Sequence, residues 1–178
     1  MAGAGPLDAH LVAETLLDVA VAALDTLPDY DATLVGAPAR QFVSPGLPAH
    51  DCEQVTVQMF SVAEAPTITM STLDVGKRGV TGRVSYVLYH VEVVRCIPTS
   101  ATRPPSAAAL GVAAAQENAD VWVLWEALHA ARRDAVLTDR CSNVVIAAAQ
   151  PLTPSGGFGG WRVPVEVQIE GYLYEVGS

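Results

Sequence analysis

Several groups of residues in the sequence have types and spacings that could support chemistry. The tripeptide HDC (residues 50–52) places three metal-ligating side chains in a row, but no second ligand cluster at metal-site spacing accompanies it. His90 and Glu92 alternate along a predicted strand, so they share one face, as a general acid and base would. We expect the tripeptide to be polar residues at a loop end, and we expect His90 and Glu92 to lie on a solvated or subunit-facing strand surface.

A thiol nucleophile and an aromatic cage are also conceivable. Cys96 or Cys141 with His129 would pair a thiol with a base, but neither cysteine lies in a signature of cysteine enzymes. Trp122 and Trp125 belong to an apolar stretch at helical spacing, which is typical of a core. We therefore expect buried thiols and core tryptophans, and we predict no catalytic residues, no cofactor and no metal.

The segment GGFGGWRVPVEVQIEG (residues 156–171) crowds four glycines around Phe158. A phosphate-binding loop needs its glycines between a strand and a following helix, where backbone amides and the helix dipole meet the anion. Here the glycines lie between two predicted strands, so we expect a turn or flexible loop. Phe158 is a candidate contact to another subunit or a partner.

Two helices and four strands must position these residues. Apolar residues at helical spacing predict a helix over 6–27, stopped by Pro28, and a second helix over 106–134 with Ser106 as its N-cap. Alternation of apolar and polar residues predicts strands within 52–65, 83–98, 143–149 and 161–170. The side chains expected to be buried where the second helix covers the sheet are Trp125, Leu128, Val165 and Val167.

This order of elements predicts an α+β fold, with a roughly four-stranded, largely antiparallel sheet and both helices packed on one face. We expect one domain over 1–178, with a long irregular connection at 28–51 and an excursion at 66–82. Lys77 and Arg78 lie between glycines in that excursion, which predicts an exposed hairpin tip. The tip either contacts a neighbouring subunit or partner, or is solvated without a partner.

The composition restricts the classes of partner. No apolar run approaches the ~18 residues of a membrane-spanning helix, and the N-terminus lacks the features of a signal peptide. The net charge is −9, and basic residues cluster only in two dipeptides, which argues against direct nucleic-acid binding. The three cysteines, of which Cys52 is the first, indicate buried thiols of a reducing compartment rather than a disulfide framework.

Five segments carry a resemblance to a known protein family. In chain order they are ALDTLP, CEQVTVQMFSV, GRVSYVLYHVEVVRCIP, ENADVWVLWEALHAA and PLTPSGGFGGWRVPVEVQI. Together they resemble the tail terminator proteins of long-tailed (siphovirus-type) bacteriophages, especially those that infect actinobacteria. The similarity spans most of residues 7–172 and is one of pattern, without an invariant motif.

This resemblance implies a structural virion protein of the head–tail junction, assembled in the host cytoplasm, and not an enzyme. Members of the family form a homohexameric ring that caps the tail tube, stops its polymerisation and offers a docking face to the head-completion (stopper) protein. The implied partners are other copies of the chain, the tail tube protein and the stopper. DNA passes through the lumen without specific binding, and no membrane is involved. The alternatives are another head–tail connector or minor tail protein, and a small cytoplasmic enzyme or ligand-binding domain.

Overall fold

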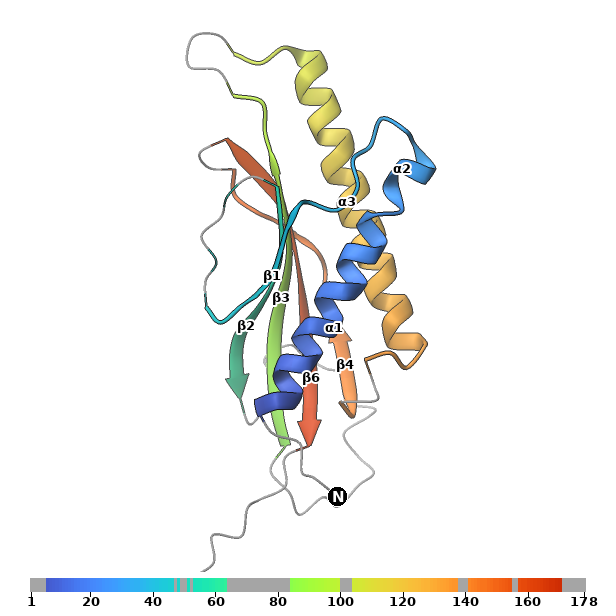
Figure 1. Cartoon of the computed structure of the whole chain (residues 1–178). Helices are drawn as coiled ribbons and strands as arrows, with labels where there is room; N and C mark the ends of the chain where they lie inside the picture. Colours follow the sequence, from blue (N-terminus) through green and yellow to red (C-terminus); the bar gives the residue numbers. More distant parts are fainter. Residues whose placement is uncertain are drawn as a thin grey trace, which may run out of the picture.

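The computed structural model describes residues 6–46, 48, 51, 53–63, 84–99, 104–137, 141–154 and 157–170. In chain order the elements are α1 (Pro6–Leu24), α2 (Leu27–Tyr30), β1 (Arg40–Ser44), β2 (Gln54–Ala63), β3 (Val84–Cys96), α3 (Ala107–Arg133), β4 (Asn143–Ile146), β5 (Gln150–Pro151) and β6 (Phe158–Glu170) (Figure 1). The predicted excursion at 66–82 lies outside these ranges. Within them, no helix has the length and apolarity needed to cross a membrane.

The described strands form one mixed, six-stranded sheet in the order β1-β2-β3-β6-β4, with β5 also paired to β6. β2, β3, β6 and β4 pair antiparallel, whereas β1 runs parallel to β2. The α+β class is confirmed, but the four-stranded, largely antiparallel prediction missed β1 and the two-residue β5. Both α2 and β1 fall within 28–51 or overlap it, so that connection is less irregular than predicted. The sequence gives little indication of β1 for two reasons. Prolines and glycines are frequent around it, and its hydrogen bonds are made with another segment of the chain, β2.

The two long helices begin and end at recognisable residues. In α3, Ser106 has an extended backbone and its hydroxyl accepts a hydrogen bond from the Ala109 amide at 3.1 Å, which confirms the predicted N-cap. The first helix ends at Leu24 and not at 27, and Pro28 lies within the first turn of α2. A proline is tolerated there because a first-turn amide has no helical partner. Pro28 therefore does not end α1, as predicted, but lies near the start of the short helix α2.

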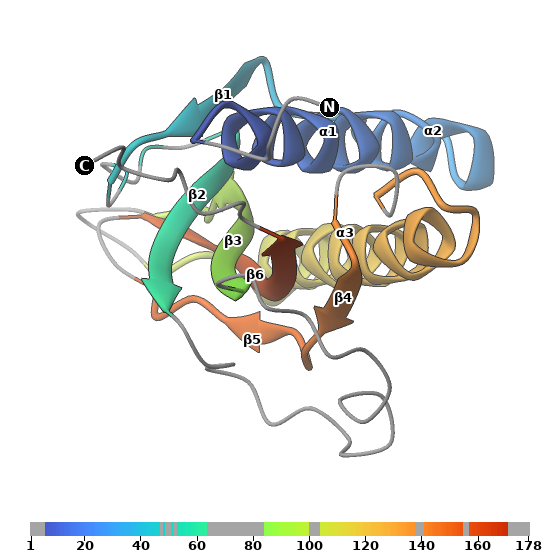
Figure 2. The same cartoon turned by 90° about the horizontal axis from the view of Figure 1, so that it is seen from below.

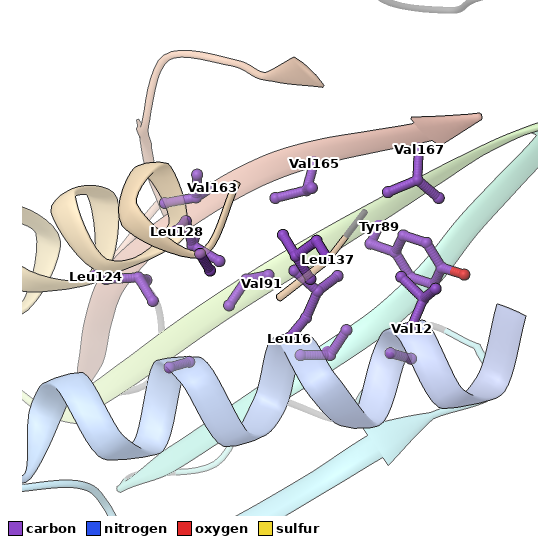
Figure 3. Close-up of a cluster of buried hydrophobic side chains, with 14 of the residues drawn as sticks. Val12, Leu16, Tyr89, Val91, Leu124, Leu128, Leu137, Val163, Val165 and Val167 are labelled. Atoms are coloured by element: carbon purple, nitrogen blue, oxygen red, sulfur yellow. The ribbon is translucent and has the colours of Figure 1, made fainter. Parts of the chain in front are cut away.

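Both long helices pack on the same face of the sheet (Figures 1 and 2). Figure 3 shows where they meet it: side chains from α1 and α3 converge on those of β3 and β6. The labelled core residues are Val12, Leu16, Tyr89, Val91, Leu124, Leu128, Leu137, Val163, Val165 and Val167. Burial of Leu128, Val165 and Val167 is confirmed, whereas Trp125 is only partly buried at the margin of the core.

The glycines at the start of β6 have a steric function. Gly157 has φ +89°, a left-handed conformation in which a glycine avoids the strain of a side chain. Gly160 has φ +154° and pairs with Val94, and a Cβ atom on it would lie 2.0 Å from the Val93 carbonyl oxygen. Gly159 and Gly160 therefore belong to β6, which approaches β3 closely, and Gly157 lies in a turn before it. The prediction of a turn or flexible loop is wrong for Gly159 and Gly160, and Gly156 lies outside the described residues.

Candidate functional site

The residues predicted to act at sites fall in different parts of the molecule. Lys77 and Arg78 lie outside the described residues, as do His50 and Cys52, so the expectations for them stay predictions. Phe158 is the first residue of β6, is half-buried and pairs with Cys96 of β3. Within the described ranges, no group of three or more histidine, cysteine or acidic side chains is arranged to hold a metal ion.

His90 and Glu92 do share a strand face, but the expected solvated or subunit-facing surface is wrong within this chain. They are 6% and 0% exposed, on the face of β3 opposite the two long helices. The cross-strand register places other polar side chains beside them, all buried except the partly buried Arg162. We call these residues the polar layer: Gln54, Thr56, Gln58, His90, Glu92, Arg162 and Glu166. The alternation of the sequence correctly placed His90 and Glu92 on one face of the strand, but it gave no information on whether that face is buried.

An ion pair and an aromatic contact hold the centre of the polar layer. Arg162 Nε donates to Glu92 Oε1 at 2.5 Å, from the residue directly opposite in register. The His90 ring stacks on Phe60, with 4.3 Å between ring centroids. Burial lowers the pKa of His90 from 6.5 to about 4, and Arg162 adds to that shift while Glu92 opposes it. His90 is therefore neutral at pH 7.

On β2 and at His90, the polar layer buries side-chain atoms without a hydrogen-bond partner, namely Gln54 Nε2, Thr56 Oγ1, Gln58 Oε1 and His90 Nδ1. Each such atom costs stability, because it loses its hydrogen bonds to water on folding. An acid–base site would need His90 to reach a reacting group, and its ring is covered by Phe60 and the sheet. This geometry favours a structural layer over an acid–base pair.

The two described cysteines differ in their surroundings. Cys141 is buried, its thiol donates to the Leu137 carbonyl at 2.8 Å, and burial raises its pKa to about 11. A thiol with that pKa stays protonated at pH 7 and is a poor nucleophile. Cys96 is exposed, so the expected buried thiol is wrong at that position. His129, the proposed base, packs against Trp125 with 4.1 Å between ring centroids, and burial lowers its pKa.

The sequence did not reveal a buried ionic network around Arg95. This residue is 4% exposed, and its guanidinium donates to both carboxylate oxygens of Asp120, each at 2.9 Å. It also donates to Glu53 at 3.0 Å and to the Gly36 carbonyl at 2.8 Å. Gln116 donates to Asp120 at 2.9 Å. The only signal in the sequence was that Arg95 continues the alternation of the core residues of β3, where a charge requires a buried partner.

An apolar groove lies between the end of α1, α2 and α3. It has a volume of about 590 Å³. We call it the α3 groove; its lining is Ala23, Thr26, Leu27, Tyr30, Leu34, Ala119, Trp122, Val123, Glu126, Ala127, Ala130 and Arg133. Tyr30 and Trp122 are 76% and 64% exposed, so the prediction that Trp122 is a core residue is wrong. Trp122 also borders a second hollow of about 490 Å³, which includes Trp125 and His129.

A second apolar surface lies at the end of β2. Met59, Phe60 and Val62 are 40%, 51% and 59% exposed, and we call these three residues the β2 tip. The pairing of β2 with β3 shifts register between Met59 and Ser61, which marks a β-bulge at Phe60. A bulge re-aims the side chain that it carries. The Phe60 ring therefore lies at an interruption of the strand pairing, where it stacks on His90 and is still half exposed.

No protein-family model and no curated protein matches this chain. The candidate site therefore rests on the geometry alone. Among the described residues, the α3 groove and the β2 tip are two surfaces that leave apolar side chains exposed to a partner. Such surfaces are typical of protein–protein contact.

Proposed function

We propose that this chain is a tail terminator: a structural protein whose copies form a ring that caps the tail tube of a long-tailed bacteriophage. The ring stops polymerisation of the tube and offers a docking face to the head-completion protein. The five sequence segments that resemble the family support this proposal, and so does the α+β class of the fold. The function requires matched surfaces and no catalytic step.

The observation that carries the proposal is the presence of two different apolar surfaces on one chain. The α3 groove and the β2 tip have different shapes and come from different elements. In both views α2 and α3 lie on the opposite side of the molecule from the end of β2 (Figures 1 and 2). Contacts between two different surfaces of identical chains generate rings when the rotation closes. A chain with such a pair of surfaces is suited to ring assembly.

The charge of the chain supports the passage of DNA through such a ring. Six chains at −9 each carry six times that charge, or −54. An acidic lumen repels the phosphate backbone, so DNA slides through it and does not adhere. Termination is then geometric: one face of the ring matches the last ring of the tube, and the other face does not template a further tube subunit.

There are two alternatives to the proposed function: one is another structural role in a phage, and the other is ligand binding. Another head–tail connector or minor tail protein would also form a ring or a ring contact, but it would not limit tube length. A small ligand-binding domain is favoured by the second hollow, where Trp125 and His129 line an apolar space of about 490 Å³. That domain would work as a monomer.

Native mass spectrometry of the purified chain, together with electron microscopy of tube protein polymerised with and without it, tests the proposal. We expect a species of six chains, and tubes that stop growing when the chain is added. A six-chain ring that leaves tube growth unchanged would favour another connector. A chain that is monomeric at all concentrations and has no effect on tubes would refute the proposal.

A further inference from the structure

We propose that the β2 tip of one copy inserts into the α3 groove of the next copy, and that this contact builds the ring. The inference rests on the proposed function, which requires ring assembly. It adds the two surfaces that meet and the residues at the centre of the contact, Phe60 and Trp122. The occupant of the α3 groove is thus a second copy of this chain.

The β2 tip offers exposed apolar side chains to a partner. The bulge at Phe60 interrupts the pairing of β2 with β3, and Phe60 lies on the same face as His90. One face of the ring is held against His90 at 4.3 Å between centroids, and 51% of the residue stays exposed. Because stacking already restricts the ring, its insertion into a partner would cost less side-chain entropy than that of a freely rotating side chain.

The α3 groove has the shape of a receiving site. Small side chains from α1 and α3 form part of its lining, namely Ala23, Ala119, Ala127 and Ala130. Tyr30 and Trp122 border the groove as exposed aromatic residues. Glu126 and Arg133 add charged groups to the lining. An apolar centre with aromatic residues and a polar rim is the usual anatomy of a protein interface.

The apolar area that is exposed at the α3 groove is large enough to form the centre of an interface between copies. A fully exposed aromatic side chain presents about 150–250 Å². At 76% and 64% exposure, Tyr30 and Trp122 together leave roughly 200–350 Å² uncovered. These two side chains alone supply roughly a quarter to two fifths of the ~800 Å² that each partner contributes to a stable interface. A small ligand would leave most of that area in water, whereas a second chain would cover it.

The positions of the two surfaces determine the type of assembly. The end of β2 lies on the opposite side of the molecule from α2 and α3, which line much of the α3 groove (Figures 1 and 2). A chain therefore cannot use both surfaces with the same neighbour across a two-fold axis. Each chain instead binds one neighbour through its tip and another through its groove. The contact is head-to-tail and can close into a ring.

The test uses two variants of the full chain, Phe60→Glu and Trp122→Glu, each with one damaged surface. Val112→Glu is the matched control, since Val112 is 68% exposed on α3 and is not part of the groove lining. We expect each of the two variants to weaken self-association by at least about 30-fold, as for a hot-spot residue. The control should assemble like the wild type. Val62→Glu and Tyr30→Glu repeat the test at the two surfaces if either first variant fails to fold by circular dichroism.

Mixing the two variants gives the decisive result. The Phe60→Glu chain retains its groove and the Trp122→Glu chain retains its tip, so an equimolar mixture should form heterodimers and nothing larger. If both variants assemble like the wild type, or if their mixture stays monomeric, the tip-in-groove contact is wrong, whereas a wild-type ring would leave the proposed function standing. A wild-type chain that neither assembles nor caps tubes would refute both proposals.

Discussion

Arg95 of β3 and Asp120 of α3 form a buried, bidentate ion pair with both N–O distances at 2.9 Å. The pair joins the end of a central strand to the middle of the longest helix, 25 residues further along the chain. Glu53, just before β2, and the Gly36 carbonyl bind the same guanidinium, so four separate segments meet at one side chain. The network sets the position of α3 on the sheet, and α3 carries one wall of the groove.

Asp120→Asn should destabilise the fold by about 1.5–3 kcal/mol, because the buried Arg95 keeps its contact with Glu53 but loses the charge of Asp120. The matched control is Asp51→Asn, which removes an exposed ion pair with Arg40 and should cost less than about 1 kcal/mol. Urea unfolding followed by circular dichroism measures both changes. Equal midpoints for the two variants would show that the buried network contributes no more than a surface pair.

Gly160→Ala should destabilise the fold more than any other alanine substitution of a glycine in the described ranges. The new Cβ would lie 2.0 Å from the Val93 carbonyl oxygen, so β3 and β6 would have to move apart. Gly111→Ala is the matched control: it lies in α3 with nothing within 4 Å of the new Cβ. It should stabilise the helix by up to about 1 kcal/mol. Thermal melts that show the same sign for both changes would contradict this account of the β6 glycines.

Acid should destabilise the fold through His90. Its pKa in the folded chain is about 4, below the ordinary 6.5, so between these pH values the unfolded chain binds a proton that the folded chain does not. Stability therefore falls as the pH falls through this window, by roughly 3 kcal/mol in total. His90→Gln should flatten the dependence. Urea midpoints measured from pH 7 to pH 4 decide the matter, and identical slopes for wild type and His90→Gln would rule this role out.

Ala135→Gly should stabilise the end of α3. Ala135 has φ +62°, a left-handed conformation in which a side chain is strained and glycine is not. We expect a gain of about 0.5–1 kcal/mol in the free energy of unfolding. The same substitution at the exposed, helical Ala115 should cost about 1 kcal/mol. A loss of stability in Ala135→Gly comparable to that in the control would contradict the strain.

Local patterns in the sequence were enough to predict several elements of the fold. The alternation from Trp161 to Ile169 predicted β6 and its core-facing residues, and Ser106 predicted where α3 begins. These signals depend on neighbours within one strand or one helical turn, so they are readable without tertiary structure. The α+β class followed from the order of these elements.

Tertiary structure decided everything that depends on residues distant in sequence. β1 exists because its backbone pairs with β2, and Arg95 tolerates burial because Asp120 meets it. The alternation of His90 and Glu92 gave no information on whether their face is covered, and the structure buries it. Helical spacing placed Trp122 on a helix, but it did not show which side of that helix is covered. The way α1 and α2 pack against α3 leaves the Trp122 side chain exposed. Periodicity states which residues share a face, whereas the contacts between elements determine what that face meets.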